Sequence, residues 1–163
     1  MLDFIKLTEN DDTYHQEVYN LLKKCGQDMY EKDNLLHWLR PYPIESIKED
    51  VKTKYVFIVK EKEYTVATFM LSDMKSIFFN DDEKFIYLSK FAVLPNMSRT
   101  GIGTRCIKYI EKLARKNNFL GIRLDVYDKS EKAIKFYIKN EFVKLFEAPT
   151  KHFRVVCMEK RVS

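Results

Sequence analysis

The 163-residue chain has few of the residues that crosslink or interrupt a fold: three cysteines, four glycines, four prolines and one tryptophan. Cys25, Cys106 and Cys157 are odd in number and far apart, and no CxxC pair occurs. This pattern argues against a disulfide framework and against a zinc site, and it is typical of reduced thiols. Few natural linkers and no internal repeat predict one domain over residues 1–163.

Several functional classes lack their signals. The three histidines show no HExxH or HxxxH spacing, so we expect no metal cofactor. The start, MLDFIKLTENDD, has neither the basic residues nor the apolar run of a secretory signal. No apolar stretch is long enough to cross a bilayer. We therefore expect a cytoplasmic protein with no membrane partner.

The charge balance is modest, with a formal net charge of +5. Hydrophobic residues make up 45% and mixed charges 33%, which indicates a folded chain with a sizeable core. A nucleic-acid surface would interleave basic residues with exposed aromatics. Here the aromatics follow strand and core periodicity, so we expect no nucleic-acid partner.

Hydrophobic periodicity predicts alternating strands and helices. Strands are expected at 2–7, 55–60, 64–71, 85–94, 121–127, 142–147 and 153–159, and helices at 13–24, 46–54, 101–117 and 130–139. Asp11 and Asp12 are expected to cap the first helix and Ser130 the last. The segment 27–43 reads as irregular and aromatic-rich. The front half is predicted to be antiparallel, with a strand–helix–strand–helix–strand back half.

The chemistry is concentrated in the turn Pro95–Thr104, where a strand leads in and a helix leaves. The first N–H groups of a helix have no partner inside it, and with the helix dipole they form an anion site. Glycines at 101 and 103 allow a phosphate to approach the backbone closely. A plain loop with packing glycines is the alternative for so short a signal.

Two known phosphate motifs fit this turn poorly. A P-loop needs a lysine that the turn does not contain. A dinucleotide fingerprint has a third glycine where this chain has Cys106, and it follows its strand directly. Asp125 lies near the distance at which that fingerprint places an acidic residue, so dinucleotide binding is kept as a distant alternative.

A third motif fits better. Residues 88–95 read LSKFAVLP and residues 98–103 read SRTGIG; downstream, residues 130–137 read SEKAIKFY and residues 140–142 read NEF. These blocks resemble the GNAT superfamily of acyl-CoA-dependent N-acyltransferases, in which a strand ending in Val-x-Pro leads to Gln/Arg-x-x-Gly-x-Gly/Ala. The second pair is similar to that family's Asn-x-x-Ala-x-x-Phe-Tyr and Gly-Phe.

The resemblance implies an α/β fold with a central mixed, mostly antiparallel sheet of about six to seven strands and helices on both faces. It also implies acetyl-CoA as co-substrate and N-acetyl transfer to a small-molecule or peptide amine. A homodimer is compatible with the family. The residues expected to hold acetyl-CoA are Phe91, Ala92, Val93, Ser98, Arg99, Thr100, Gly101, Ile102, Gly103, Thr104, Ser130, Ala133, Phe136 and Tyr137.

Three positions depart from the family pattern: Ser98 replaces Gln or Arg, Ser130 replaces Asn, and Glu141 replaces Gly. The backbone cradle does not depend on these side chains. The sequence around the cradle is basic. Residues 96–118 contain one acidic residue and six basic ones: Arg99, Arg105, Lys108, Lys112, Arg115 and Lys116. Such a helix start suits the phosphates of coenzyme A.

Tyr137 is the expected general acid. It lies two helical turns after Ser130 and shares its face, and a phenol can protonate a departing thiolate. By the resemblance, Phe91 to Val93 hold the pantetheine arm as an added strand, and one of their N–H groups polarises the acetyl carbonyl. A buried core tyrosine is the structural alternative.

The base and the acceptor pocket are left open. Residues 86–93 contain no carboxylate, which leaves Asp125 and Asp73 as candidates for the base. The aromatic segment 30–42 is either an acceptor lid or a satellite core, and as a lid its Glu31 and Asp33 would attract a cationic amine. A coenzyme A-binding sensor of the same fold is the alternative function; it would tolerate loss of Tyr137, which this chain retains.

Overall fold

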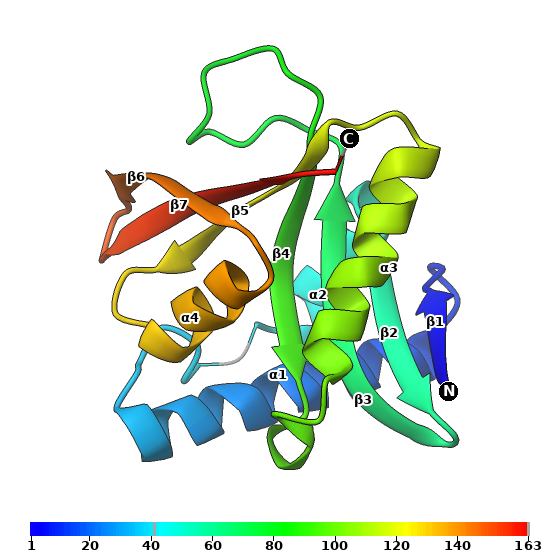
Figure 1. Ribbon diagram of the computed structural model, residues 1–163. Coiled ribbons are helices and arrows are strands. Elements are labelled where there is room, and N and C mark those ends of the chain that lie inside the picture. Colours follow the sequence, from blue (N-terminus) through cyan, green and yellow to red (C-terminus); the bar gives the residue numbers. More distant parts are fainter. Residues whose placement is uncertain (41, 163) are drawn as a thin grey trace. The chain divides into compact units, whose positions relative to one another are not determined.

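The computed structural model describes residues 1–40 and 42–162. Its strands are β1 (Leu2–Lys6), β2 (Tyr55–Glu61), β3 (Tyr64–Ser72), β4 (Ile86–Val93), β5 (Gly121–Tyr127), β6 (Val143–Pro149) and β7 (Arg154–Arg161). Its helices are α1 (Asp12–Asp33), α2 (Ile44–Thr53), the 3-10 turn η1 (Pro95–Met97), α3 (Ile102–Lys116) and α4 (Glu131–Lys139). Figure 1 shows these elements.

The strands of the described residues form a seven-stranded sheet in the order β1-β2-β3-β4-β5-β7-β6. The pairs β1–β2, β2–β3, β5–β7 and β6–β7 are antiparallel, and β4–β5 is parallel. The expected mixed, mostly antiparallel sheet is therefore confirmed. The chain groups into two compact units. The first unit contains Met1–Ser72 and Lys90–Gly103, and the second contains Asp73–Ser89 and Thr104–Ser163. Residue 163 lies outside the described part.

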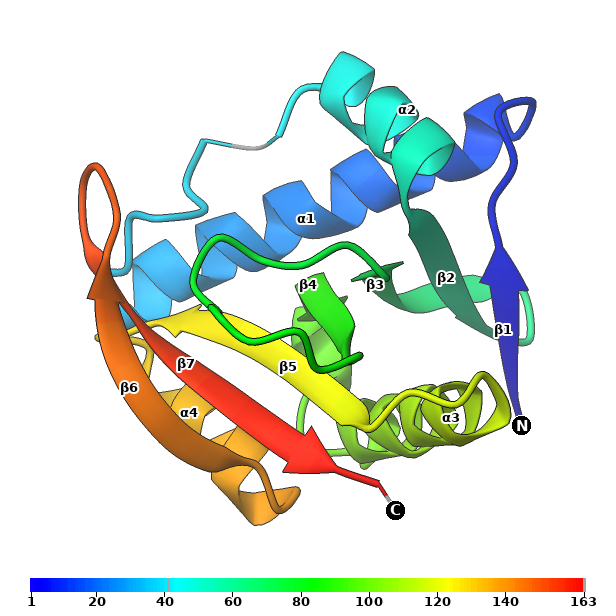
Figure 2. The same cartoon turned by 90° about the horizontal axis from the view of Figure 1, so that it is seen from above.

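The first unit is held by α1 and α2, which lie on the same side of β2 and β3 (Figure 2). The apolar face predicted for α1 is buried as expected, through Val18, Leu21, Leu22 and Cys25. Their side chains join a core that includes Ile47 of α2 and residues of β2, β3 and β4. Burial of such side chains at helical spacing is what stabilises the helix in this position.

Helix α1 extends to Asp33, nine residues beyond the predicted end at residue 24. The predicted helix stops before Gly26, but this glycine lies inside the helix for a packing reason. A Cβ atom at Gly26 would lie 2.0 Å from the backbone oxygen of Trp38. The glycine therefore lets the following segment approach α1, and Asn34 in the left-handed conformation ends the helix.

The second unit contains β5, β7 and β6, with α4 packed against β6 (Figure 1). Its loop after β3 is fastened by Arg123 of β5, which is 5% exposed. The guanidinium donates to both carboxylate oxygens of Asp81, at 2.9 and 2.8 Å, and to Glu159 at 2.9 Å. It also lies over the rings of Phe79 and Phe85. This network holds the loop on the sheet of the second unit.

Asp11 and Ser130 occupy the predicted N-cap positions, but neither makes the expected side-chain cap bond. Asp11 is the N-cap residue of α1, but its carboxylate accepts hydrogen bonds from the backbone N–H and hydroxyl of Thr8, at 2.7 and 2.9 Å, and makes no cap bond. Ser130 is the N-cap residue of α4 and makes no side-chain cap bond. Within the described residues, no helix has the length and apolarity required to cross a membrane.

Candidate active site

The predicted phosphate turn has two residues with positive φ. After η1, Ser98 is extended, Arg99 has φ 66° and Gly101 has φ 87°. The hydroxyl of Thr100 donates to the carbonyl of Met97 and closes the turn. Helix α3 then begins at Ile102, so its first N–H groups point out of the helix toward the turn.

The positive φ of Gly101 favours glycine at this position, and the space beside it is open to a ligand. A Cβ atom built at Gly101 would meet nothing within 4 Å. Ser98, Arg99, Thr100 and Gly101 are exposed, whereas Ile102 is buried and anchors the helix start. An open, glycine-bearing loop before a helix N-terminus is the geometry that binds phosphate through backbone N–H groups.

The strand before the turn is irregular at Lys90, where φ is 46°. Phe91 lies against the ring of Phe69, with ring centroids 6.2 Å apart, and Ala92 is buried. The thiol of Cys25 donates to the carbonyl of Val93 at 3.2 Å. Burial raises the pKa of Cys25 to about 12, so this thiol stays protonated and structural.

Strands β4 and β5 pair over a short distance in the second unit. The parallel register joins Ile86 to Ile122 and Tyr87 to Arg123, and in the described part of that unit it does not continue to Leu88 and Ser89. The described Leu88 and Ser89 of the second unit therefore lie outside this ladder. A strand edge outside a ladder is where an extended ligand arm can add as a further strand.

Helix α4 brings the downstream motif together. Ser130 is 4% exposed, and its hydroxyl has no hydrogen-bond partner among the described residues. Ala133 and Phe136 are half-buried. Because a buried hydroxyl without a partner is costly, an orphaned Ser130 hydroxyl is a group to which a ligand can hydrogen-bond. The sequence did not predict that it would be left unpaired.

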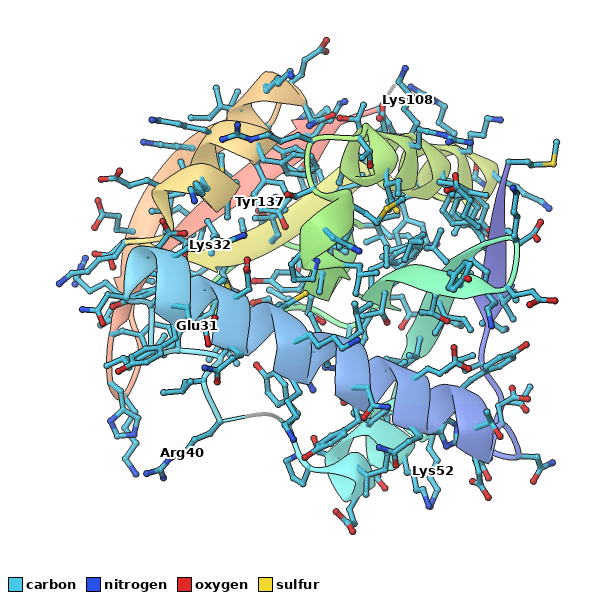
Figure 3. All side chains as sticks on the ribbon, turned by 90° about the horizontal axis from the view of Figure 1, so that it is seen from below. Glu31, Lys32, Arg40, Lys52, Lys108 and Tyr137 are labelled. Carbon is cyan, nitrogen blue, oxygen red and sulfur yellow. The ribbon has the colours of Figure 1, made fainter. Side chains whose placement is uncertain are left out.

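Tyr137 is buried on the same helix, and Figure 3 labels it. Its ring packs against Phe136 and Phe142, with centroids 5.3 and 5.4 Å away. Burial raises the pKa of Tyr137 well above its ordinary value, and the negative charge of Asp125 raises it further. The phenol is therefore protonated at any physiological pH.

The two candidate bases lie in different environments. Asp125 is half-buried and accepts a hydrogen bond from the hydroxyl of Tyr87. Burial raises the pKa of Asp125, and this hydrogen bond lowers it in part. Asp73 is exposed at the start of the loop after β3. Neither carboxylate lies on the half of β4 that leads to the turn.

Comparison with known proteins decides the family. The model of the acetyltransferase (GNAT) family matches residues 15–142, most of the chain. This chain belongs to the GNAT acetyltransferase family. No curated protein matches the acetyltransferase in sequence. The match to the family model confirms the predicted family, together with acetyl transfer as its general chemistry.

Solved structures share the fold of this acetyltransferase. An N-acetyltransferase from Staphylococcus aureus Mu50 has a TM-score of 0.77 at 18% identity, covering 99% of this chain and 98% of its own. The ribosomal-protein-S18-alanine N-acetyltransferase from Escherichia coli has a TM-score of 0.72 at 16% identity, covering 100% and 95%. YncA, a putative acetyltransferase from Salmonella typhimurium solved with its cofactor acetyl-CoA, has a TM-score of 0.69 at 12% identity, covering 99% and 94%.

The residues of this acetyltransferase fit acetyl-CoA on two structural observations. The Gly101 turn is open at a helix N-terminus, and the Ser130 hydroxyl is buried with no partner among the residues that the structure describes. The basic residues of α3 are exposed, as expected for a charged surface, but they are not all available. Arg115 donates to the carbonyl of Val162 at 2.8 Å and so has a structural role.

An open groove of about 390 Å³ lies in the first unit, beside the segment that precedes the turn. It is lined by Lys24, Gln27, Asp28, Glu31, Leu94, Pro95 and Asn96. Glu31, labelled in Figure 3, accepts a hydrogen bond from Gln27 at 2.8 Å, and Asp28 pairs with Lys32 at 2.9 Å. Of the two acidic residues proposed from the sequence, Glu31 lines this groove and Asp33 does not.

The aromatic segment packs on the core of the first unit. Trp38 and Tyr42 lie against the buried cluster of α1, α2 and β2. Ring centroids are 6.0 Å apart for His37 and Trp38, and 6.5 Å apart for Trp38 and Tyr42. Burial lowers the pKa of His37, which favours its neutral form. Residue 41 of this segment lies outside the described residues.

A further cluster was missed by sequence reasoning. Lys90 of β4 forms an ion pair with Asp50 of α2, and its ammonium lies over the ring of Tyr42. These residues are far apart in the sequence and share no motif spacing. The strain at Lys90 was equally hidden, because lysine gives no signal of positive φ.

Proposed function

We propose that this acetyltransferase moves the acetyl group of acetyl-CoA to a primary amine by direct attack, with Tyr137 as general acid. One observation carries the proposal: α4 presents an orphaned Ser130 hydroxyl and a buried, protonated Tyr137 two turns apart on one face. The Ser130 hydroxyl offers a hydrogen bond to the bound coenzyme A arm, and Tyr137 offers a proton to the thiolate that leaves.

In this proposal a different set of residues would contact each part of acetyl-CoA. The N–H groups at the start of α3 and the Arg99 guanidinium would hold the pyrophosphate. The backbone of Phe91, Ala92 and Val93 would hold the pantetheine arm as an added strand. The Ser130 hydroxyl would satisfy its missing hydrogen bond on the same arm, beside Ala133 and Phe136. The absence of a Cβ atom at Gly101 keeps the approach open.

The reaction balances without any further reagent. The amine nitrogen attacks the acetyl carbonyl carbon, and a backbone N–H of β4 stabilises the oxygen that becomes negative. The carbon–sulfur bond then breaks, and the sulfur takes the Tyr137 proton. The nitrogen loses one proton to solvent, which later returns a proton to Tyr137. A sulfur leaving beside buried Tyr137 would share its dry surroundings, and burial would then raise the proton affinity of the thiolate as well.

The acceptor is proposed as a class, a small-molecule or peptide amine. Residues 86–93 contain no carboxylate, so the amine enters as the free base or loses its proton through water. Glu31 in the groove of the first unit supports acceptors with a second positive charge. A cytoplasmic location, one N-acetyltransferase domain over 1–163, and the absence of a nucleic-acid partner are proposed with it.

The test is thiol release from acetyl-CoA against a panel of amines. The panel holds monoamines, polyamines, amino acids, aminoglycosides and peptides with free N-termini. Amine-dependent thiol release, with the acetylated amine identified by mass spectrometry, would support the proposal. Binding of acetyl-CoA without turnover on any amine would instead favour a coenzyme A sensor.

A further inference from the structure

Strand β4 contains a strained residue directly before the segment proposed to hold the thioester. Lys90 has φ 46°, a conformation that residues with a side chain rarely adopt and that is uncommon inside a strand. Strain of this kind persists where the surrounding structure enforces it. Contacts that hold Lys90 are therefore expected, and the structure contains them.

Two groups of the first unit hold the Lys90 side chain, and a third contacts its partner Asp50. Its ammonium lies 2.5 Å from Oδ2 of Asp50 and 4.1 Å from the centroid of the Tyr42 ring. The side chains of Lys90 and Asp50 are each 13% exposed. Lys54 lies 3.7 Å from the other carboxylate oxygen of Asp50 and is one-third exposed. The Lys90 ammonium is thus nearly enclosed, which a flexible surface lysine is not.

Stability alone is a poor reason for this arrangement. Burying an ion pair costs about as much in desolvation as it returns in attraction, and left-handed lysine adds backbone strain. Two unfavourable features therefore meet at one residue of β4. Their shared consequence is local: positive φ at Lys90 rotates the peptide that joins it to Phe91 away from regular strand geometry, as a β-bulge does.

We propose that Lys90 is a positioning residue whose ion pair with Asp50 holds this rotated peptide, so that the Phe91 N–H is available to the acetyl carbonyl oxygen. The inference rests on the proposed function, because it assigns a role in the same transfer reaction. In this proposal Lys90 acts through the backbone and not by contact with the substrate or the sulfur. Asp50 and Tyr42 act through Lys90, and through it on the backbone.

A comparison of three substitutions at one residue separates backbone positioning from other roles. Lys90→Met keeps side-chain length but loses the ion pair. Lys90→Gly also loses the ion pair, but glycine adopts positive φ without strain. Lys90→Arg keeps a positive charge for Asp50. If the side chain acts through the backbone, Gly and Arg retain more activity than Met.

The expected result is a fall in kcat of about 10²-fold for Lys90→Met, the scale of losing one oxyanion donor, with KM for acetyl-CoA changed about threefold or less. Asp50→Asn should behave like Lys90→Met, whereas Lys90→Gly and Lys90→Arg should recover at least about tenfold of the lost kcat. Lys60→Met is the matched control, since it breaks a different ion pair of the first unit, Lys60–Glu17 at 3.5 Å, and should leave kcat unchanged.

Two outcomes overturn the inference while the proposed function stands. The first is equal kcat for Lys90→Met and Lys90→Gly. The second is a Lys90→Met variant that keeps its kcat and has a raised KM for acetyl-CoA. Melting temperatures show that each variant is folded under assay conditions. If Lys90→Met fails to fold, the kcat values of Lys90→Gly and Lys90→Arg are compared with that of the wild type. Falls in kcat as large as that of Asp50→Asn then overturn the inference. A folded wild-type chain that neither transfers nor hydrolyses acetyl groups overturns the proposed function, and the inference with it.

Discussion

Replacing Tyr137 by phenylalanine removes one hydroxyl and leaves the ring in place. The ring contacts with Phe136 and Phe142 remain, so the free energy of unfolding should change by about 1 kcal/mol or less. A positioned general acid contributes about 10²–10⁴-fold to a rate. We expect kcat to fall about 10²–10³-fold, which corresponds to ~3–4 kcal/mol of transition-state stabilisation, with little change in acetyl-CoA binding.

The pH profile sharpens this prediction. Burial and the charge of Asp125 raise the pKa of Tyr137, so the protonated, acid-competent form persists as pH rises. The alkaline limb due to Tyr137 should therefore lie above pH ~10, the ordinary value for tyrosine. Initial rates of thiol release, measured at saturating acetyl-CoA across neutral and alkaline pH, provide the assay.

Tyr87→Phe is the matched control for Tyr137→Phe. Tyr87 is a half-buried tyrosine of the second unit, whereas Tyr137 is buried, and the Tyr87 hydroxyl donates to Asp125. Its loss should lower the melting temperature, because Asp125 is left without its donor, and should leave kcat within a few-fold. If Tyr137→Phe retains kcat within about threefold of the wild type, the assignment of Tyr137 as general acid is refuted.

Ser130→Ala should raise the melting temperature slightly, because it removes an unpaired buried hydroxyl, yet it should weaken acetyl-CoA binding in calorimetry; unchanged affinity would contradict the ligand role. Glu141 has φ 71° where the family has glycine, so Glu141→Gly should stabilise the fold by ~1 kcal/mol in urea titrations, and a destabilised variant would count against the strain argument. Gly101→Ala should raise KM for acetyl-CoA several-fold without reducing expression, since φ 87° disfavours alanine; an unchanged KM would speak against the cradle. The hydrogen bond from Arg123 lowers the pKa of Asp81, so its stabilising effect is present above pH ~3.9 and is lost as pH falls through the lower folded-state pKa; Asp81→Asn should flatten the acid side of the melting profile.

Local patterns predicted the elements because each reports on burial along one segment. The helix over Ser46–Lys54 and the strand over Gly121–Tyr127 lie at or within two residues of their observed bounds. Helix α1 was predicted too short, since the segment from residue 27 was read as irregular. Gly26 lies inside the helix and allows the close approach of Trp38, a tertiary contact that no local pattern records.

The site divides in the same way. The turn at Gly101 and the motif ending in Tyr137 are each continuous in sequence, so the sequence could single them out as candidates. The pair of Lys90 and Asp50 spans forty residues and has no local signal. The Ser130 hydroxyl was expected to cap α4 and is unpaired instead, since cap geometry depends on backbone angles that residue type does not fix. The same holds for Glu141, whose positive φ explains why the family has glycine there.

The central claim is transfer of an acetyl group from acetyl-CoA to an amine nitrogen, and one measurement tests it most directly. Purified chain is incubated with isotope-labelled acetyl-CoA and the amine panel, and products are followed by mass spectrometry. The account predicts labelled N-acetyl product in equal amount to free coenzyme A, with the rate lost in Tyr137→Phe. Release of coenzyme A without labelled amide, or no release with any amine, would contradict it.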